Sequence, residues 1–151
     1  MAGQILACVD PSPAGERACA AAIEMAVRFG RPLTLVTVLP GSEKDSHPDL
    51  DRLVPMQSGG RSIHQMLEEA QAEALKKGVP AAEIVYLRGN VFEALMAYLE
   101  PSPPDLVVVG TRGRSRGSRI LLGSVSSRLV TEAPCPVLVV RTVRKPGGKA
   151  I

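Results

Sequence analysis

At 151 residues and 16.0 kDa, the chain has the size of one domain with a hydrophobic core of its own. Its net charge of +3 and aromatic fraction of 3% disfavour nucleic acid as a partner, because few rings are available to stack on bases. The sequence shows neither a signal peptide nor an apolar run long enough for a membrane span. We therefore expect a cytoplasmic protein with no membrane partner.

The chain begins with the pattern of a strand, a turn and a helix. Residues 4–9 are apolar and run into a turn that contains two prolines. Ser12 suits the N-cap of a helix and Pro13 its first position, because the proline ring presets a helical φ. Gly30 then ends the helix at about Phe29. The face that we expect this helix to bury consists of Cys19, Ile23, Ala26 and Val27.

A second strand and a long polar segment follow. Residues 33–39 are almost continuously apolar, which is typical of a strand buried on both faces of a parallel sheet. Residues 40–60 are polar, rich in proline and glycine, and longer than an ordinary connection. We interpret them as a lid over a ligand, a partner-binding segment or a disordered loop.

The middle of the chain predicts a helix, a strand and a short helix. Apolar residues at spacings of 3, 4, 3 and 4 indicate the first helix, which ends at Gly78. Residues 83–87 form the strand, and Asn90 suits the N-cap of the short helix, with Glu93 three residues later. The apolar face of the first helix consists of Ile63, Met66, Leu67, Ala70 and Ala74.

The last part of the chain predicts two strands with a helix between them. Residues 106–109 are an apolar run that stops at Gly110, and a loop rich in Gly, Arg and Ser follows. Residues 124–132 predict a helix, residues 136–141 the last strand, and residues 143–151 a flexible tail. The order βαβαβαβαβ predicts an α/β fold, a parallel sheet with helices on both faces.

The glycine loop is the clearest functional feature of the sequence. Glycines bring the backbone close to a ligand, and its N–H groups together with a helix start attract an anion. Ser124 and Ser126 add hydroxyl donors. The spacing of Gly110, Gly113 and Gly123 is neither a Walker loop nor a G-x-G-x-x-G fingerprint. The loop predicts a phosphate site; alternatively, its glycines serve only flexibility.

The spacing Gly110-x2-Gly113-x9-Gly123-Ser124 resembles the nucleotide-binding signature of the universal stress protein family. The strand that ends in Asp10 is similar to that family's first strand. The resemblance covers about residues 4–141 and implies a single domain in residues 1–142. It implies an open five-stranded parallel sheet in the order 3-2-1-4-5. This fold is of the nucleotide-binding α-hydrolase-like type. The resemblance also implies an ATP-binding, regulatory or stress-response protein that forms a homodimer.

In that strand order the ends of strands one and four meet, which brings Asp10 beside Gly110. Beside a polyphosphate, a carboxylate acts through Mg²⁺ or a ribose hydroxyl, so Asp10 is the candidate metal ligand. The resemblance places the adenine against the end of the second strand. The candidate residues for ATP are Asp10, Pro11, Ser12, Thr37, Val38, Gly110, Arg112, Gly113, Gly123, Ser124, Val125 and Ser126.

The sequence gives little support for catalysis. His47 and His64 have no Cys or Ser partner at a spacing typical of a triad, and we expect both at the surface. Any ATP hydrolysis should be slow. One alternative is an ATP pyrophosphatase or ligase that uses the Ser-Gly-Gly sequence at residues 58–60. Another is a partner-binding module with a vestigial pocket.

The last strand predicts how two copies associate. Val137, Leu138, Val139 and Val140 are apolar without interruption and lie at a sheet edge in the order 3-2-1-4-5. An open edge exposes unpaired backbone groups, so antiparallel pairing of two copies would satisfy both edges. The alternative is that the chain after Thr142 folds back over the edge.

Overall fold

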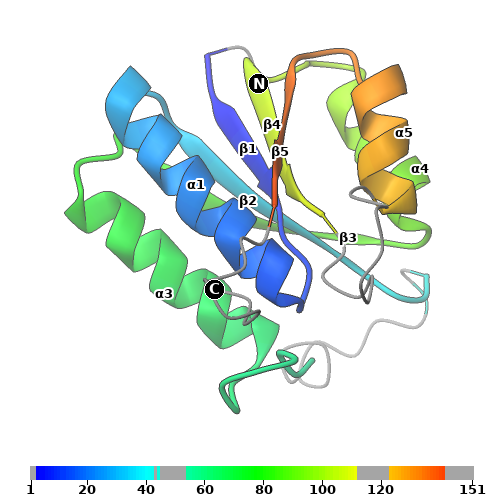
Figure 1. Cartoon of the computed structure of the whole chain (residues 1–151), viewed down its shortest axis with the longest axis horizontal. Helices are drawn as coiled ribbons and strands as arrows, with labels where there is room; N and C mark the ends of the chain where they lie inside the picture. The colour runs from blue at the N-terminus through cyan, green and yellow to red at the C-terminus, as the bar shows by residue number, and fades with distance from the viewer. Residues whose placement is uncertain (1–2, 43, 45–53, 112–122, 142–151) are drawn as a thin grey trace, which may run out of the picture.

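The computed structural model describes residues 3–42, 44, 54–111 and 123–141. Strands and helices alternate along these residues (Figure 1). The strands are β1 (Ile5–Cys8), β2 (Leu33–Leu39), β3 (Ala82–Arg88), β4 (Leu106–Gly110) and β5 (Val137–Val140). The helices are α1 (Pro13–Phe29), α3 (Ile63–Lys76), α4 (Val91–Leu99) and α5 (Ser124–Glu132).

The five strands form one parallel sheet in the order β3-β2-β1-β4-β5, which confirms the predicted fold. In the centre of the sheet, Ala7 on β1 is in register with Leu35 on β2 and Val108 on β4. All three of these side chains are fully buried. The continuous apolar runs of the central strands therefore reflect burial on both faces, as expected for a parallel sheet.

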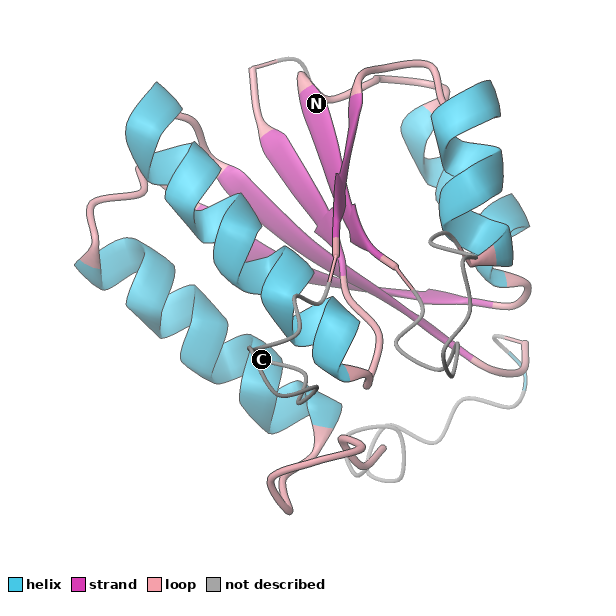
Figure 2. Ribbon diagram, in the orientation of Figure 1, coloured by secondary structure: helices cyan, strands magenta, loops and turns pink. Residues whose placement is uncertain are grey.

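Helices cover both faces of the sheet (Figure 2). α1 and α3 pack on one face, where their apolar residues join a core with Leu35 and Val108. α4 and α5 pack on the other face, where Leu95 and Leu129 join a second core with Leu6. Among the helices in the described residues, none is both long and apolar enough to cross a membrane.

α1 begins and ends where the sequence predicted, but one residue of the face that we expected it to bury is exposed. Ser12 is the N-cap and accepts a hydrogen bond from the Gly15 N–H, and Gly30 ends the helix in the left-handed conformation. Ile23 and Ala26 are buried as expected, whereas Val27 is 40% exposed. At 100° per residue, Val27 lies at the margin of the buried stripe, so the prediction that it is buried was wrong.

α3 buries the five apolar residues that its spacing predicted. It begins with a capping box that we did not predict, in which Ser62 accepts from the Gln65 N–H and the Gln65 side chain accepts from the Ser62 N–H. The capping box fixes the direction in which the chain enters the helix. At the other end of the helix, Lys77 forms an ion pair with Glu73 at 2.9 Å.

The described end of the long polar segment forms a hairpin, the 54–62 hairpin. Pro55 and Ser62 form an antiparallel bridge, and the Gln57 N–H donates to the Pro11 carbonyl at 3.0 Å. Gly59 and Gly60 have positive φ at its exposed tip. This part of the segment is thus docked beside the β1–α1 turn, because the buried Met56 anchors it to the core of α1 and α3.

Candidate functional site

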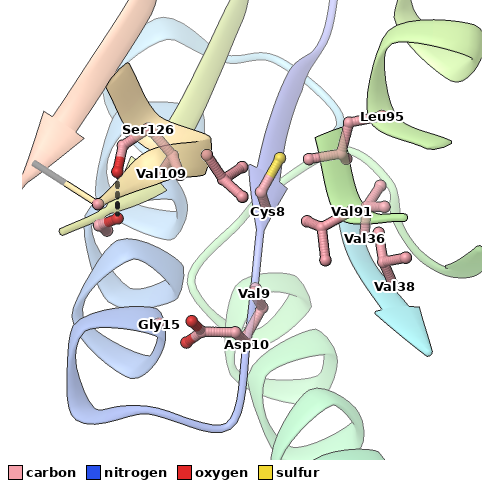
Figure 3. A pocket seen from close by; sticks show the side chains of 13 residues that line it. Cys8, Val9, Asp10, Gly15, Val36, Val38, Val91, Leu95, Val109 and Ser126 are labelled. Carbon is pink, nitrogen blue, oxygen red and sulfur yellow. Dashed lines mark hydrogen bonds between the residues drawn. The ribbon is translucent and has the colours of Figure 1, made fainter. Parts of the chain in front are cut away.

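The carboxyl ends of β1 and β4 meet where the strand order reverses, as predicted. Cys8 is in register with Val109, so Asp10, just past the end of β1, and Gly110, the last residue of β4, lie at adjacent strand ends. A pocket opens at this point, between the sheet and helices α4 and α5 (Figure 3). Its volume is about 120 Å³. This is the position at which open parallel sheets bind ligands.

The pocket has an apolar part and a polar part. The apolar part lies between β1, β2 and α4, and the polar part lies toward Asp10 and the start of α5. The lining residues are Cys8, Val9, Asp10, Gly15, Val36, Val38, Val91, Leu95, Val109, Gly110, Gly123, Val125 and Ser126. An apolar wall with a few polar groups at one end is the usual composition of a small-molecule site.

Asp10 is held at the head of α1 by its own turn. Its Oδ1 atom accepts hydrogen bonds from the Ser12 N–H, at 3.0 Å, and from the Ser12 hydroxyl. The Ser12 oxygen in turn accepts from the Gly15 N–H at 3.1 Å and caps the helix. Ser12 therefore couples the start of α1 to the orientation of an exposed carboxylate in the pocket.

The polar end of the pocket is closed by α5. Gly123 is the N-cap of this helix and brings no side chain to the pocket. The buried Ser126 hydroxyl donates to the Gly110 carbonyl oxygen at 3.4 Å, which ties α5 to the end of β4 (Figure 3). The positive end of the α5 dipole is therefore directed at the polar end of the pocket.

Cys8 is part of the pocket wall and not only a small core residue. Its side chain is half-buried, with Val109 on one side and Leu95 on the other (Figure 3). Burial, and to a smaller extent the neighbouring Cys135, raise the pKa of the Cys8 thiol to about 12. The thiol is therefore protonated at neutral pH and acts as a weakly polar contact.

The candidate residues divide into four groups. Thr37 lies in β2 and is 2% exposed, but it does not line the pocket because its side chain points to the α1 and α3 face. Pro11, Ser12 and Ser124 lie next to lining residues without lining the pocket themselves. Arg112 and Gly113 lie outside the described residues. Those that line the pocket are Asp10, Val38, Gly110, Gly123, Val125 and Ser126.

Sequence reasoning missed most of the apolar wall. Val36 shares a face with Val38 through the alternation of β2, and this alternation could have identified it. Val91 and Leu95 come from the helix capped by Asn90, one turn apart on one face. No local motif distinguishes these residues from ordinary core residues, because their role depends on how α4 packs on the sheet.

Two further predictions concern residues outside the pocket. Ser58 lies with Gly59 and Gly60 at the exposed tip of the 54–62 hairpin, so the described Ser-Gly-Gly sequence is not part of the pocket. His64, which we expected at the surface, is partly exposed and lies beside Tyr86. His47 lies outside the described residues.

Metal binding at the pocket rests on Asp10 alone. Within the ranges 3–42, 54–111 and 123–141, no group of three His, Cys, Asp or Glu side chains is arranged to hold an ion. Mg²⁺ is commonly held by one or two carboxylates together with substrate phosphates and water. The residues present fit Mg²⁺ only as a companion of a phosphate ligand.

Comparison with known proteins identifies the family. A family model described as the universal stress protein family matches residues 1–141. The chain belongs to this family. A putative universal stress protein of Staphylococcus haemolyticus is 32% identical over 143 residues, which cover 94% of this chain and 86% of that protein.

Two other family members show how far the similarity extends. A universal stress protein of Thermus aquaticus is 43% identical over 75 residues, 49% of this chain. The match spans only about half the length of that relative, 55%. Among solved structures, a universal stress protein in complex with cAMP is 26% identical, with a TM-score of 0.71. The alignment covers 91% of this chain and 96% of that one.

Proposed function

We propose that this family member binds ATP or a related adenine nucleotide in the pocket between β1, β4, α4 and α5 and acts as a nucleotide-dependent regulatory or stress-response factor. The observation that carries the proposal is the meeting of an apolar slot with a polar end at the strand-order reversal. A flat base and a charged phosphate chain require these two environments side by side.

The base belongs in the apolar part of the pocket. Val38, Val91 and Leu95 provide an apolar wall for one face of a ring. The enclosed volume of about 120 Å³ is below the roughly 300–1,000 Å³ typical of pockets that hold whole drug-sized ligands. We therefore place the base inside the pocket and the phosphates beyond its polar end.

The phosphates belong near the start of α5. Gly110 and Gly123 allow close approach of the backbone, and the α5 N-terminus contributes N–H donors and the positive end of its dipole. Mg²⁺ would be held by Asp10 together with the phosphates, where it would neutralise part of the negative charge. The complex of a related universal stress protein with cAMP supports an adenine nucleotide as the ligand.

We further propose that binding, and not turnover, is the role of the site. In the described part of the chain, the ionisable side chains that line the pocket are Asp10 and Cys8, and the Cys8 thiol is protonated at neutral pH. Neither is arranged with a histidine as an activated nucleophile among the described residues. Phosphate release should therefore stay far below the enzyme median of about 10 per second.

The assembly that we propose is a homodimer through β5. This strand forms one edge of the sheet, and its four residues are half-buried in the single chain. Pairing with a second copy would cover this edge and satisfy its outward backbone groups.

Mass spectrometry of the ligand released from freshly purified protein tests the proposed ligand class. We expect an adenine nucleotide in amounts approaching one per chain, or, from ligand-free protein, an increase in Tm on adding ATP with Mg²⁺. Protein that releases no nucleotide and whose Tm is unchanged by saturating ATP, ADP, AMP and cAMP would contradict it.

A further inference from the structure

A second group of reactive side chains lies on the face of the sheet opposite the pocket. His64 in the first turn of α3 contacts Tyr86 on the edge strand β3, its Nδ1 atom paired with the phenolic oxygen. The two ring centroids are 5.9 Å apart, with an interplanar angle of 34°. The His64 Nε2 atom lies 3.1 Å from Oε1 of Glu68, one turn farther along α3.

One of the proton arrangements that these contacts allow joins the three groups in a relay. When Nε2 carries the proton and donates it to the Glu68 carboxylate, Nδ1 is left to accept the proton of the Tyr86 hydroxyl. The three groups then form a chain of carboxylate, imidazole and hydroxyl. A hydroxyl beside a base that is oriented by a third group is the general arrangement of an activated nucleophile.

The Tyr86 side chain is partly exposed, and the imidazole is held in place. Tyr86 is 38% exposed on a strand whose outer side is a sheet edge. The side chain of His64 is only 21% exposed, and His64 lies within the capping box of Ser62 and Gln65 that begins α3. A small molecule can therefore reach the phenol, while the imidazole keeps its orientation from the helix.

We propose that Glu68, His64 and Tyr86 form a nucleophilic relay that makes the Tyr86 phenol the preferred acceptor of an acyl group from a small, neutral, activated ester or thioester. A neutral donor is chosen because Glu68 and Arg88 place charges of opposite sign on this face, so that neither an anionic nor a cationic donor is favoured. The relay is separate from the nucleotide proposal, since α3 and β3 lie across the sheet from the lined pocket.

The step is a single acyl transfer. The Tyr86 oxygen attacks the acyl carbon while its proton passes to Nδ1 of His64, and Glu68 stabilises the imidazolium that forms. The bond from the acyl carbon to the leaving group then breaks, and the leaving group takes the proton from His64. The products are an aryl ester on Tyr86 and the free alcohol or thiol, with no oxidant or reductant involved.

Acetylation by p-nitrophenyl acetate, followed by peptide mass spectrometry, tests the relay. The chain has two tyrosines, so Tyr98 on α4 is an internal reference. We expect Tyr86 to be acetylated at neutral pH, and His64→Gln to slow its acetylation about 100-fold, the lower limit for loss of a general base. Glu68→Gln should slow it less. Glu73→Gln is the matched control, because it removes the other i,i+4 pair of α3 without contacting the relay.

The pH profile separates the relay from a purely structural hydrogen bond. Among the described residues, Glu68 on α3 is the charged group paired with the ring, and Tyr86 and Arg88 share the face of β3 that is directed at α3. With the relay, the pH profile of Tyr86 acetylation changes in His64→Gln, because the imidazole no longer accepts the phenolic proton. An unassisted phenol instead gains about tenfold per pH unit up to about pH 10.

Two results would overturn the proposal. One is a Tyr86 rate that keeps rising to pH 10, with His64→Gln unchanged from the wild type. The other is acetylation of Tyr98 as fast as that of Tyr86 in protein whose circular dichroism is native. Tyr86→Phe, which keeps the ring between α3 and β3, should fold normally and lose only the modified peptide.

Discussion

Gly110 lies directly against the first turn of α1, at Ala14. A Cβ added at Gly110 would come within 2.7 Å of the Ala14 carbonyl carbon, closer than real Cβ atoms approach such a group. Gly15 is similarly enclosed, because a Cβ there would lie 2.8 Å from the Asp10 backbone nitrogen. Two glycines at the pocket are thus required by the packing of α1 on β1 and β4, independently of any ligand.

We therefore expect Gly110→Ala to destabilise the fold. The neighbour that it meets is backbone and cannot move aside as a side chain does, so the free energy of unfolding should fall by about 1–3 kcal/mol, as in other overpacked sites. Urea unfolding followed by circular dichroism measures this. Ser124→Ala, at an exposed helix position nearby, should change stability little. A stable Gly110→Ala variant would show that α1 can shift away from β4.

The close approach at Gly110 illustrates what the sequence could predict and what it could not. The glycine itself, the apolar run before it and its position at a strand end were all predicted from the pattern. Its contact with Ala14 was not, because the two residues are 96 positions apart and meet only through the crossover of the sheet. From the sequence, we attributed Gly110 to ligand binding alone, whereas the packing of α1 also requires a glycine at this position.

The same distinction applies to β2 and the polar segment after it. Its apolar run predicted the strand, but Thr37 was chosen as a site residue although strand alternation directs Val36 and Val38 into the pocket. The 54–62 hairpin could not be predicted because its stability comes from tertiary contacts, the buried Met56 and the hydrogen bond from Gln57 to Pro11. Local polarity indicated only a long loop.

Ser12 should affect both stability and ligand binding. Ser12→Ala removes the N-cap of α1 and the hydroxyl that donates to Asp10, so unfolding should become easier by about 0.5–2 kcal/mol. Nucleotide affinity in the presence of Mg²⁺ should also fall, because Asp10 loses one of the two hydrogen bonds that orient it. Urea unfolding and calorimetric titration with ATP measure the two effects.

Ser62→Ala is the matched control for this variant. Ser62 caps α3 through the Gln65 N–H at 3.1 Å, the same distance as the cap of α1, but it lies outside the pocket. We expect a similar loss of stability with unchanged affinity. Equal loss of affinity in both variants would mean that Ser12 acts only through helix stability.

Cys19 should make stability depend on pH in the alkaline range. Burial, with Glu73 and Glu16 as smaller causes, raises the pKa of its thiol from 9.0 to about 12 in the folded protein. Between these values the unfolded chain loses the proton and the folded chain keeps it, so stability falls as pH rises from about 9 to 12. Cys19→Ala should show a shallower decline in urea unfolding at pH 8.5 and pH 10.5 than the wild type. Parallel declines would contradict the assignment.

The proposed dimer can be tested at Val139. The Pro136 and Val140 carbonyls accept hydrogen bonds from β4, so by alternation the backbone groups of Val139 point to the free edge. Val139→Pro removes the outward N–H and should yield a folded monomer by light scattering. Val139→Thr keeps the N–H and should remain dimeric. A folded Val139→Pro dimer would place the interface elsewhere.

Calorimetric titration of ATP into Val38→Trp tests most directly whether the pocket holds the nucleotide. Val38 lines the apolar part of the pocket, so an indole there should occupy the place of the base and weaken ATP binding at least about tenfold, equivalent to 1.4 kcal/mol. Val130→Trp, at a position of α5 that is 52% exposed, is the matched control and should bind ATP like the wild type. Wild-type affinity in a natively folded Val38→Trp variant would contradict a nucleotide site in this pocket.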